Sequence, residues 1–363
     1  MTDAPESAAT GGVAKASPPV RLKRTNLRSL TLAEIEAWVE RREFQGYRAA
    51  QIAGWLYNRA PTELDDMTNL PAVLREALAE DFDTTLPSVC LRSESEDSTI
   101  KLLVGLADAK VVEAVVIPRE DRRTLCISSQ VGCALDCKFC ATGKMGLDRN
   151  LDASEIVAQV LLGRQAADPW PLTNYVFMGM GEPLANYDRL IRALEIMTAR
   201  WGLGISPRRI TVSTAGLVPQ MERLAAESSV NLAISLTAGR DELRDQLFPI
   251  NRRYPLAELM AACRRLDLPR RRRLSFEYTM LDGVNDTERD SNDLIRLFAG
   301  MRVKLNLIPF NEFPNSGFRS TPWERIEAFQ TRMLQADVHT TVRASRGRDI
   351  DAACGQLATA AAS

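Results

Sequence analysis

Three closely spaced cysteines, Cys133, Cys137 and Cys140, are the residues of this sequence best suited to chemistry. Three thiolates on one loop can hold three irons of a [4Fe–4S] cluster and leave the fourth iron without a protein ligand. Such an open iron can bind and reduce a small molecule. The alternative is a structural zinc site, which needs four ligands, and the sequence has no second pair of cysteines or suitably spaced histidine to supply them. The spacing therefore favours a [4Fe–4S] cluster.

The histidine count shifts the expected chemistry further towards cysteine. The 363 residues include seven cysteines but one histidine, His339, to which we assign a structural role. A Ser-His-Asp triad, a two-histidine zinc site or a facial-triad iron site needs that histidine in one place or needs more than one. With 45% apolar residues and a net charge of −1, the chain can bury a sizeable core and is not a disordered acidic or basic chain.

The elements that must position these cysteines fall into two parts. Thr31 and Glu34 have the spacing of a capping box and open a small all-helical unit that extends to about Phe82. Beyond it strands and helices alternate, with strands predicted at residues 111–117, 124–129, 174–178, 209–213, 231–236, 274–280, 303–308 and 338–342. This alternation predicts a parallel sheet, open or rolled into a barrel, with function at the C-terminal ends of its strands.

The segment before the helical unit, residues 1–27, is predicted to be a disordered tail. Most of it is rich in small and polar residues, and it lacks the apolar region of a secretory signal. No run of about eighteen apolar residues occurs, so no membrane span is predicted. The odd number of cysteines argues against a secreted disulfide framework, and we expect a cytoplasmic protein.

The cysteine spacing, with Phe139 directly before the third cysteine, resembles the radical S-adenosylmethionine (SAM) superfamily. In that superfamily the amino and carboxylate groups of the methionine moiety chelate the open iron. The same resemblance makes residues 178–182, Met-Gly-Met-Gly-Glu, the segment that holds this moiety. Physically, the glycines allow close backbone approach and Glu182 can accept a hydrogen bond from an ammonium group.

Five segments together resemble a narrower group, the RlmN/Cfr family of radical RNA methyltransferases, and most closely its RlmN branch. They are residues 126–132, 178–184, 212–216, 306–311 and 349–357. Residues 47–52 also resemble the N-terminal accessory domain of that family. The resemblance implies an α/β fold, with a partial (β/α)6 TIM-like barrel of the radical SAM type at residues 96–363 and an all-helical accessory RNA-binding domain at residues 28–95.

The resemblance also implies how three residues would act. Cys354 would accept a methyl group from one SAM as an S-methylcysteine intermediate, and a radical derived from a second SAM would activate that methyl carbon for addition to adenine. Cys126 would resolve the resulting protein–RNA crosslink by forming a disulfide with Cys354. Glu113 occupies the position of the family's proton acceptor. On the residues alone, both cysteines also fit buried apolar side chains and Glu113 also fits a solvent-facing strand carboxylate.

Further residues are assigned to cofactor binding by the same resemblance: Gly181, Glu182, Ser213, Ser235, Leu236, Thr237 and Asn311. At one of them the sequence departs from the family, because relatives often have Ser-Leu-His-Ala where residues 235–238 are Ser-Leu-Thr-Ala. Threonine can hydrogen-bond a ribose hydroxyl but cannot act as an imidazole. A side-chain contact from Thr237 therefore stays open, whereas a backbone contact does not depend on the residue type.

Two activities occur in this family, methylation of adenine at C2 and at C8. Pro183 resembles the C2 branch, because the resistance branch tends to have alanine there. The resemblance therefore predicts C2 methylation of an adenosine in the peptidyl transferase centre of 23S rRNA, and leaves the anticodon-adjacent adenosine of tRNA open as a second substrate. It also implies an electron donor such as flavodoxin or ferredoxin, and we expect a monomer. The alternatives are a C8 methyltransferase and a non-catalytic Fe–S protein that binds RNA or acts as a sensor.

Because the net charge is near zero, RNA binding must depend on local patches. Residues 252–273 hold eight arginines against two acidic residues, a local charge of +6. Residues 270–273, four arginines in a row, fit a phosphate-binding patch and a solvated helix face equally well.

Overall fold

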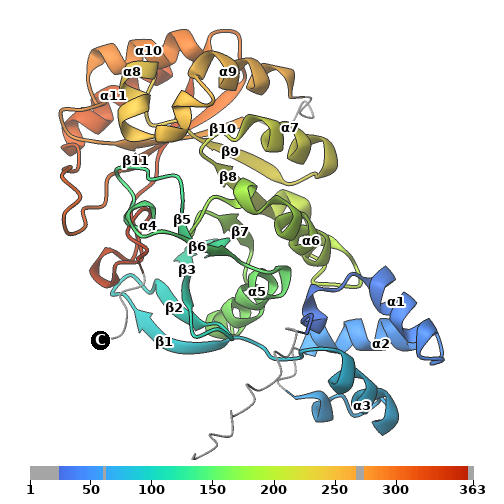
Figure 1. Cartoon of the computed structure of the whole chain (residues 1–363). Helices are drawn as coiled ribbons and strands as arrows, with labels where there is room; N and C mark the ends of the chain where they lie inside the picture. The colour runs from blue at the N-terminus through green and yellow to red at the C-terminus, as the bar shows by residue number, and fades with distance from the viewer. Residues whose placement is uncertain (1–23, 60–62, 267–273, 359–363) are drawn as a thin grey trace, which may run out of the picture.

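The computed structural model describes residues 24–59, 63–266 and 274–358. Residues 1–23 of the predicted tail and the arginines at residues 270–273 lie outside these ranges. The described chain forms a helical unit and a large curved sheet with helices around it (Figure 1). Within these ranges no helix combines the length and the apolar character needed to cross a bilayer.

The helical unit consists of α1 (Leu32–Arg41), α2 (Arg48–Gly54) and α3 (Ala72–Asp81). The predicted capping box begins α1, because Thr31 and Glu34 each accept a hydrogen bond from the other's backbone amide, at 3.3 and 2.8 Å. This unit lies beside α5 and α6 of the larger part, at one end of the molecule (Figure 1).

The start of the unit differs from the prediction. Residues 24–27 were predicted as part of the tail, but Leu27 is fully buried and its amide donates to the Asp83 carbonyl oxygen at 2.8 Å. Asn26 also donates from its side chain to the Thr85 carbonyl oxygen at 2.9 Å. The prediction of a tail is therefore wrong for these four residues.

The larger part is a ten-stranded sheet in the order β1-β2-β3-β4-β7-β8-β9-β10-β11-β12. Its strands are β1 (Ser88–Glu94), β2 (Ile100–Gly105), β3 (Val111–Arg119), β4 (Arg122–Cys126), β7 (Asn174–Phe177), β8 (Ile210–Thr214), β9 (Asn231–Ser235), β10 (Leu274–Met280), β11 (Val303–Pro309) and β12 (His339–Val342). The pairs from β1 to β4 are antiparallel and those from β4 to β12 are parallel.

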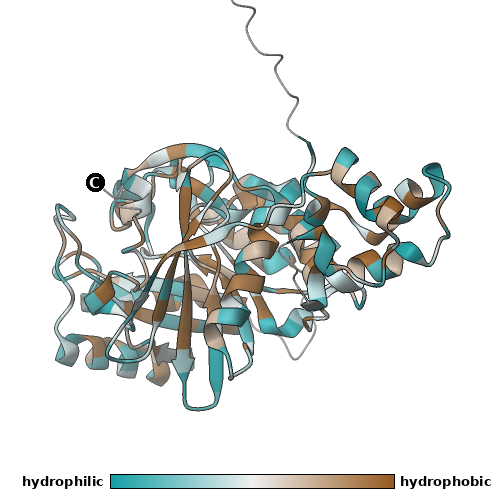
Figure 2. Cartoon of the chain, turned by 90° about the horizontal axis from the view of Figure 1, so that it is seen from below, coloured by the Kyte–Doolittle hydropathy of each residue, from teal (hydrophilic) through white to brown (hydrophobic). Residues whose placement is uncertain are grey.

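Helices follow each of the six parallel strands before β12, which confirms the predicted partial (β/α)6 barrel. They are α4 (Ala141–Lys144), α5 (Ala153–Ala167), α6 (Tyr187–Thr198), α7 (Val218–Glu227), α8 (Asp241–Leu247), α9 (Leu256–Arg265), α10 (Glu288–Phe298) and α11 (Trp323–Gln335). Seen from below, hydrophobic residues follow the strands at the centre and hydrophilic residues lie on the outer helix faces (Figure 2). The main core therefore lies between sheet and helices.

The sheet begins earlier than the predicted domain boundary after residue 95. Strand β1 pairs with β2, so Ser88–Glu94 belongs to the sheet although it falls inside the range predicted for the accessory domain. The reason is that β1 is an edge strand exposed along nearly its whole length and therefore lacks the apolar alternation by which strands are recognised.

The segment after β12 connects the two edges of the open sheet. Gly347 donates from its amide to Asp97 at 3.0 Å, and Asp349 accepts from the Ser95 hydroxyl at 2.5 Å. Figure 1 shows this segment, in red, beside α4 and the β1–β2 edge. The segment that carries Cys354 is therefore fixed against elements that lie far earlier in the chain.

Candidate active site

The three clustered cysteines lie in a short hairpin of β5 (Gln130–Cys133) and β6 (Gly146–Asn150). Cys133 ends β5, and Cys137 and Cys140 lie on the loop that connects the two strands. At Gly132, with φ +74°, a Cβ atom would lie 1.9 Å from the Gly146 carbonyl oxygen, so the hairpin requires glycine there. The loop also packs on the far side of the barrel, because the Lys138 amide donates to the Leu247 carbonyl oxygen at 3.0 Å.

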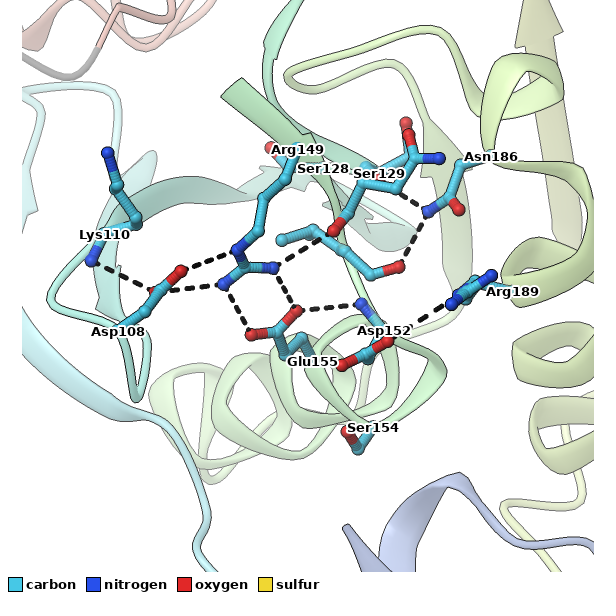
Figure 3. A network of polar contacts seen from close by, with 12 residues as sticks. Asp108, Lys110, Ser128, Ser129, Arg149, Asp152, Ser154, Glu155, Asn186 and Arg189 are labelled. Carbon is cyan, nitrogen blue, oxygen red and sulfur yellow. Dashed lines mark hydrogen bonds and ion pairs between the residues drawn. The ribbon is translucent and has the colours of Figure 1, made fainter. Parts of the chain in front are cut away.

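A polar network fixes this hairpin to the rest of the barrel (Figure 3). Arg149 of β6 pairs with Asp108, before β3, at 2.7 Å and with Glu155 of α5 at 2.8 Å. The Arg149 guanidinium lowers the pKa of Asp108 to about 2. Glu155 also accepts a hydrogen bond from the Asp152 amide at 2.8 Å and thereby caps α5. Arg149 thus fixes the β6 strand of the hairpin to Asp108 on one side and to α5 on the other.

Cys133, Cys137 and Cys140 all line one cavity at the C-terminal ends of the strands. Burial raises the pKa of each thiol, that of Cys133 to about 11, so a metal must displace protons to bind there. In the described residues no three His, Cys, Asp or Glu side chains converge closely enough to share one ion. A cluster does not require that convergence, because each thiolate binds a different iron, and the three cysteines fit one.

The loop after β7 forms another wall of this cavity. Gly179, Gly181 and Glu182 all line it. A Cβ at Gly179 would lie 2.7 Å from the Ser128 hydroxyl, and Gly181 has φ +94°, so both positions need glycine. Such a cradle leaves room for a ligand against the backbone, which suits the methionine moiety of SAM.

Glu182 is held more firmly than the sequence suggests. Its two carboxylate oxygens accept hydrogen bonds from the Leu184 and Ala215 amides at 3.0 and 2.8 Å. Burial raises the pKa of this carboxyl to about 7. Each oxygen keeps a lone pair that an ammonium group could use.

Three other residues assigned to the cofactor also face this cavity, namely Ser213, Ser235 and Thr237. The Ser213 and Ser235 hydroxyls lie 3.4 Å apart. Thr237 has φ +54°, a conformation that β-branched residues rarely adopt. Leu236 is fully buried and is not among the lining residues, so only its backbone could contact the cofactor.

Cys354 and Cys126 meet at a second cavity, of about 410 Å³, inside the barrel. Cys354 lines both cavities, whereas Cys126 lines the second one and is 6% exposed. Both are free thiols, as are the other five cysteines. Burial raises the pKa of Cys126 to about 12. The structure therefore brings together the two cysteines that the sequence places far apart.

The position of Cys354 is fixed by contacts on both sides of it. Asn311 donates from its side-chain amide to the Cys354 carbonyl oxygen at 3.0 Å. The neighbouring Gly355 carbonyl oxygen accepts from the Ala141 amide at 2.8 Å. The Asn311 side-chain oxygen is buried and has no hydrogen-bond partner among the described residues, which leaves an acceptor for a ligand. Asn311 lines the second cavity and not the cavity of the three cysteines.

Glu113 stands apart from these residues, because it lines neither cavity. It is 3% exposed and lies 3.7 Å from the Lys101 ammonium group, while its Oε2 atom has no hydrogen-bond partner in the part of the chain that the structure describes. Its carbonyl oxygen accepts from the Ser128 hydroxyl at 2.6 Å, which places it level with the C-terminal end of β4. Burial raises the pKa of this carboxyl.

Two arginines beside the cavities, one buried and one partly exposed, were missed by the sequence analysis. Arg244 is fully buried, and its guanidinium donates to the Ala215, Ser235 and Leu236 carbonyl oxygens at 2.7 to 3.3 Å. It thus ties together the ends of β8 and β9, and burial lowers its pKa to about 10. No local pattern marks it, because its partners lie on other elements.

The second missed arginine is Arg343, directly after β12. It lines the cavity of Cys126 and Cys354 and lies 3.2 Å from Glu277 of β10. Burial raises the pKa of the Cys354 thiol and Arg343 opposes that shift. A lone arginine at the end of a predicted strand was the signal that could have drawn attention to it.

Family comparisons agree with this geometry. The sequence matches the radical SAM superfamily over residues 127–295 and the ribosomal RNA large subunit methyltransferase N-terminal domain over residues 25–83. A crystal structure of a radical SAM methyltransferase from Sphaerobacter thermophilus superposes with a TM-score of 0.88 at 45% identity, covering 92% of this chain and 99% of that one. Fold and site together thus define a radical SAM protein.

Relatives identify its family. The chain is 48% identical over 332 residues to the dual-specificity RNA methyltransferase RlmN of Syntrophobacter fumaroxidans, covering 91% of this chain and 97% of the relative. It is 50% identical over 332 residues to that of Geobacter sulfurreducens, covering 92% and 91%. The chain therefore belongs to the RlmN family of radical SAM methyltransferases.

Proposed function

We propose that this protein methylates C2 of an adenosine in the peptidyl transferase centre of 23S rRNA, and C2 of the anticodon-adjacent adenosine of tRNA. The observation that carries the proposal is that Cys354 lines both the cavity of the three clustered cysteines and the cavity of Cys126. A methyl carrier must face the source of the methyl group on one side and its acceptor on the other, and a residue that lines both cavities meets that requirement.

When bound, the cluster and SAM would supply the methyl group and the radical that removes a hydrogen atom from it. Cys133, Cys137 and Cys140 would hold the cluster. Residues 179–182, with Ser213, Ser235 and Thr237, would hold SAM against the ends of the strands, in the cavity that they line together.

Cys354 and Cys126 then have different roles. The Cys354 sulfur takes a methyl group, and the carbon of that group later forms a bond to the adenine ring. The Cys126 thiolate attacks the Cys354 sulfur, and the sulfur–carbon bond breaks with its electron pair passing to the carbon on the nucleotide. That carbon takes up a proton to become the methyl group, and the disulfide left between the two cysteines is reduced by an external thiol before the next turnover. Their shared cavity supports this exchange.

Glu113 is proposed as the base that accepts the ring proton. Its buried Oε2 atom has no partner among the described residues, and because burial raises its pKa the ionised carboxylate is a stronger proton acceptor than a solvated one. Because it lines neither cavity, the proton would reach it through an intervening group or a small movement of the segment that carries Cys354.

Three further assignments belong to the proposal. The helical unit, α1 to α3, would help to bind RNA. A flavodoxin or ferredoxin would supply electrons. The protein would act as a monomer in the cytoplasm, where its RNA substrates are found and where reducing conditions keep the seven thiols free.

The test is mass spectrometry of nucleosides from rRNA and tRNA after anaerobic incubation with protein, SAM and reductant. We expect 2-methyladenosine, and three to four irons per chain by metal analysis. Exclusive 8-methyladenosine would instead assign the C8 activity. An iron–sulfur protein that yields neither methylated nucleoside nor 5′-deoxyadenosine would be a binding or sensor protein.

A further inference from the structure

Positive charge lines the second cavity from the end that lies away from Cys354 to Arg343 near that cysteine. Five cations line this cavity: Arg119, Arg122, Lys304, Arg343 and Arg346. Arg343 pairs with Glu277 at 3.2 Å, and Arg346 lies 3.9 Å from Asp97. The side chains of Arg119, Arg122 and Lys304 make no hydrogen bond or ion pair with any residue in the described parts of the chain.

Burial and neighbouring cations lower the pKa of Arg119 and of Lys304. Burial and then the neighbouring arginines lower the pKa of Arg119, and burial, Arg343 and Arg122 lower the pKa of Lys304. The whole chain carries a net charge of −1, so its composition does not force cations together. Glu277 and Asp121 offset part of the repulsion on Lys304 and Arg119, and an anion that binds between the cations would offset more of it.

The strands show how this charge relates to the reactive thiols. Arg119 and Arg122 face each other across the β3–β4 turn, and Lys304 is the second residue of β11. All three lie level with the N-terminal ends of the parallel strands, because Arg119 ends the antiparallel β3 opposite the start of β4. Cys126 ends β4 at the opposite side. The cavity therefore runs along the barrel axis from a basic mouth to Cys126 and Cys354.

The length of this passage suits one nucleotide. Along β11, Lys304 and the cavity-lining Ile308 are separated by about 13 Å at the usual rise per residue. An extended lysine or arginine side chain and one nucleotide can span that distance together. Between the two ends, Asn306 donates to Glu277 and accepts from the Thr341 hydroxyl, both at 2.8 Å, and its second amide hydrogen and second lone pair remain for a base.

We propose that this cavity admits the target nucleotide from the N-terminal ends of the strands, and that Arg119, Arg122 and Lys304 bind the RNA phosphates on either side of it. The inference rests on the proposed function and adds the direction from which RNA approaches. The adenine base extends along the barrel interior to Cys354, while the phosphodiester chain stays at the mouth, where counterion release supplies affinity without reading sequence.

The test compares RNA binding by the triple variant Arg119→Gln/Arg122→Gln/Lys304→Gln with that by a matched variant, Arg200→Gln/Arg289→Gln/Arg319→Gln. The control residues are exposed and line neither cavity. The probe is an RNA hairpin with one adenosine in its loop, titrated at several salt concentrations. We expect the cavity variant to bind roughly tenfold more weakly and its dependence of log affinity on log salt to become shallower by about two, with the control close to the unaltered protein.

A second RNA sharpens the assignment. Methylphosphonates in place of the two phosphates that flank the adenosine should weaken binding by the unaltered protein and barely change binding by the cavity variant. Equal losses in both proteins would overturn the proposal, and so would a larger loss in the control than in the cavity variant. The cavity variant should also melt no lower than the unaltered protein, since the three cations repel one another. A lower melting temperature would mean that they serve the fold.

The same protein samples separate this inference from the proposed function. If the unaltered protein forms 2-methyladenosine but the cavity variant binds RNA equally well, the phosphate assignment fails and the function stands. If the variant loses RNA binding but the unaltered protein never methylates, the phosphate site stands and the function fails.

Discussion

The two cavities that meet at Cys354 differ in how completely their charged side chains are paired. In the cavity of the clustered cysteines, Glu182 has both oxygens bonded to backbone amides, and the adjacent Arg244 is bonded to backbone carbonyl groups. In the other cavity, Arg119 and Lys304 have no partner in the described residues. The first cavity is shaped before any ligand arrives, whereas the second leaves charge for a ligand to neutralise.

This difference matches what each cavity is proposed to accept. A small cofactor is held best by groups that are already fixed, because no reorganisation is then needed when it binds. An RNA chain brings its own negative charges, and cations without partners can meet them without first breaking an ion pair. Each prediction below tests whether Cys354 joins two sites with these separate roles.

The largest effect is expected for Cys354→Ser. No other cysteine lines both cavities, so methylation should fall by about 10³-fold or more, as expected when an essential nucleophile is removed. RNA affinity and iron content should stay within about twofold, because the side chain keeps its size and neither site loses a contact. Mass spectrometry of the nucleosides and RNA titration measure the two quantities. Substantial methylation by this variant would remove Cys354 from its place between the cavities.

Cys126→Ala should stop the reaction after one turnover. The methyl carbon would join Cys354 to the adenosine, and no thiol in that cavity would remain to release it. Denaturing gels should show a covalent protein–RNA band that requires SAM and reductant. Cys90→Ala, which alters an exposed cysteine, is the matched control and should form no such band. A Cys126 variant that turns over repeatedly would contradict the resolving role.

Glu113→Gln should lower methylation by about 10²-fold without lowering stability. Because burial raises the pKa of Glu113, its ionisation favours the unfolded chain. This penalty is absent at low pH and grows as pH rises through the unfolded pKa of about 4.3, so the glutamine variant should melt at or above the unaltered protein near pH 7. A variant that melts well below it would show a structural role instead of proton transfer.

The smallest effect is expected for Asn311→Ala. One hydrogen bond to the Cys354 carbonyl oxygen is lost, which is worth about 1 kcal/mol, or about fivefold in the rate of Cys354 methylation. Peptide mass spectrometry follows that rate. The family resemblance assigns Asn311 to the cofactor, and a large loss of SAM affinity would support that assignment. A change in the Cys354 methylation rate alone would instead make Asn311 a positioning residue.

Much of the barrel could be predicted because its signals are local. The strands β7 to β11 lie within a residue or two of the predicted ranges, since buried parallel strands are short apolar runs between turns. Strand β2 was missed although Ile100, Leu102 and Val104 alternate as a strand requires. Strand β1 could not be found in this way, because an exposed edge carries no such alternation.

The residues of the site likewise divide into those that a local sequence pattern marks and those that it does not. The clustered cysteines were predicted because a single loop carries all three ligands. Arg244 and Arg343 were missed because their partners lie on other strands and helices, so their function exists only after folding. Cys126 and Cys354 were paired through a family resemblance, since nothing in the sequence between them indicates that the two would share a cavity.

The contacts that hold the Cys354 segment also set an order of assembly during synthesis. The ribosome makes the chain from its N-terminus, so Ser95, Ala141 and Asn311 all exist before the segment that they bind. A nascent chain can therefore form the cysteine loop and the basic mouth while it still lacks Cys354, the proposed methyl acceptor. On that proposal, reactive chemistry begins only when the last strand has been made and its following segment has docked.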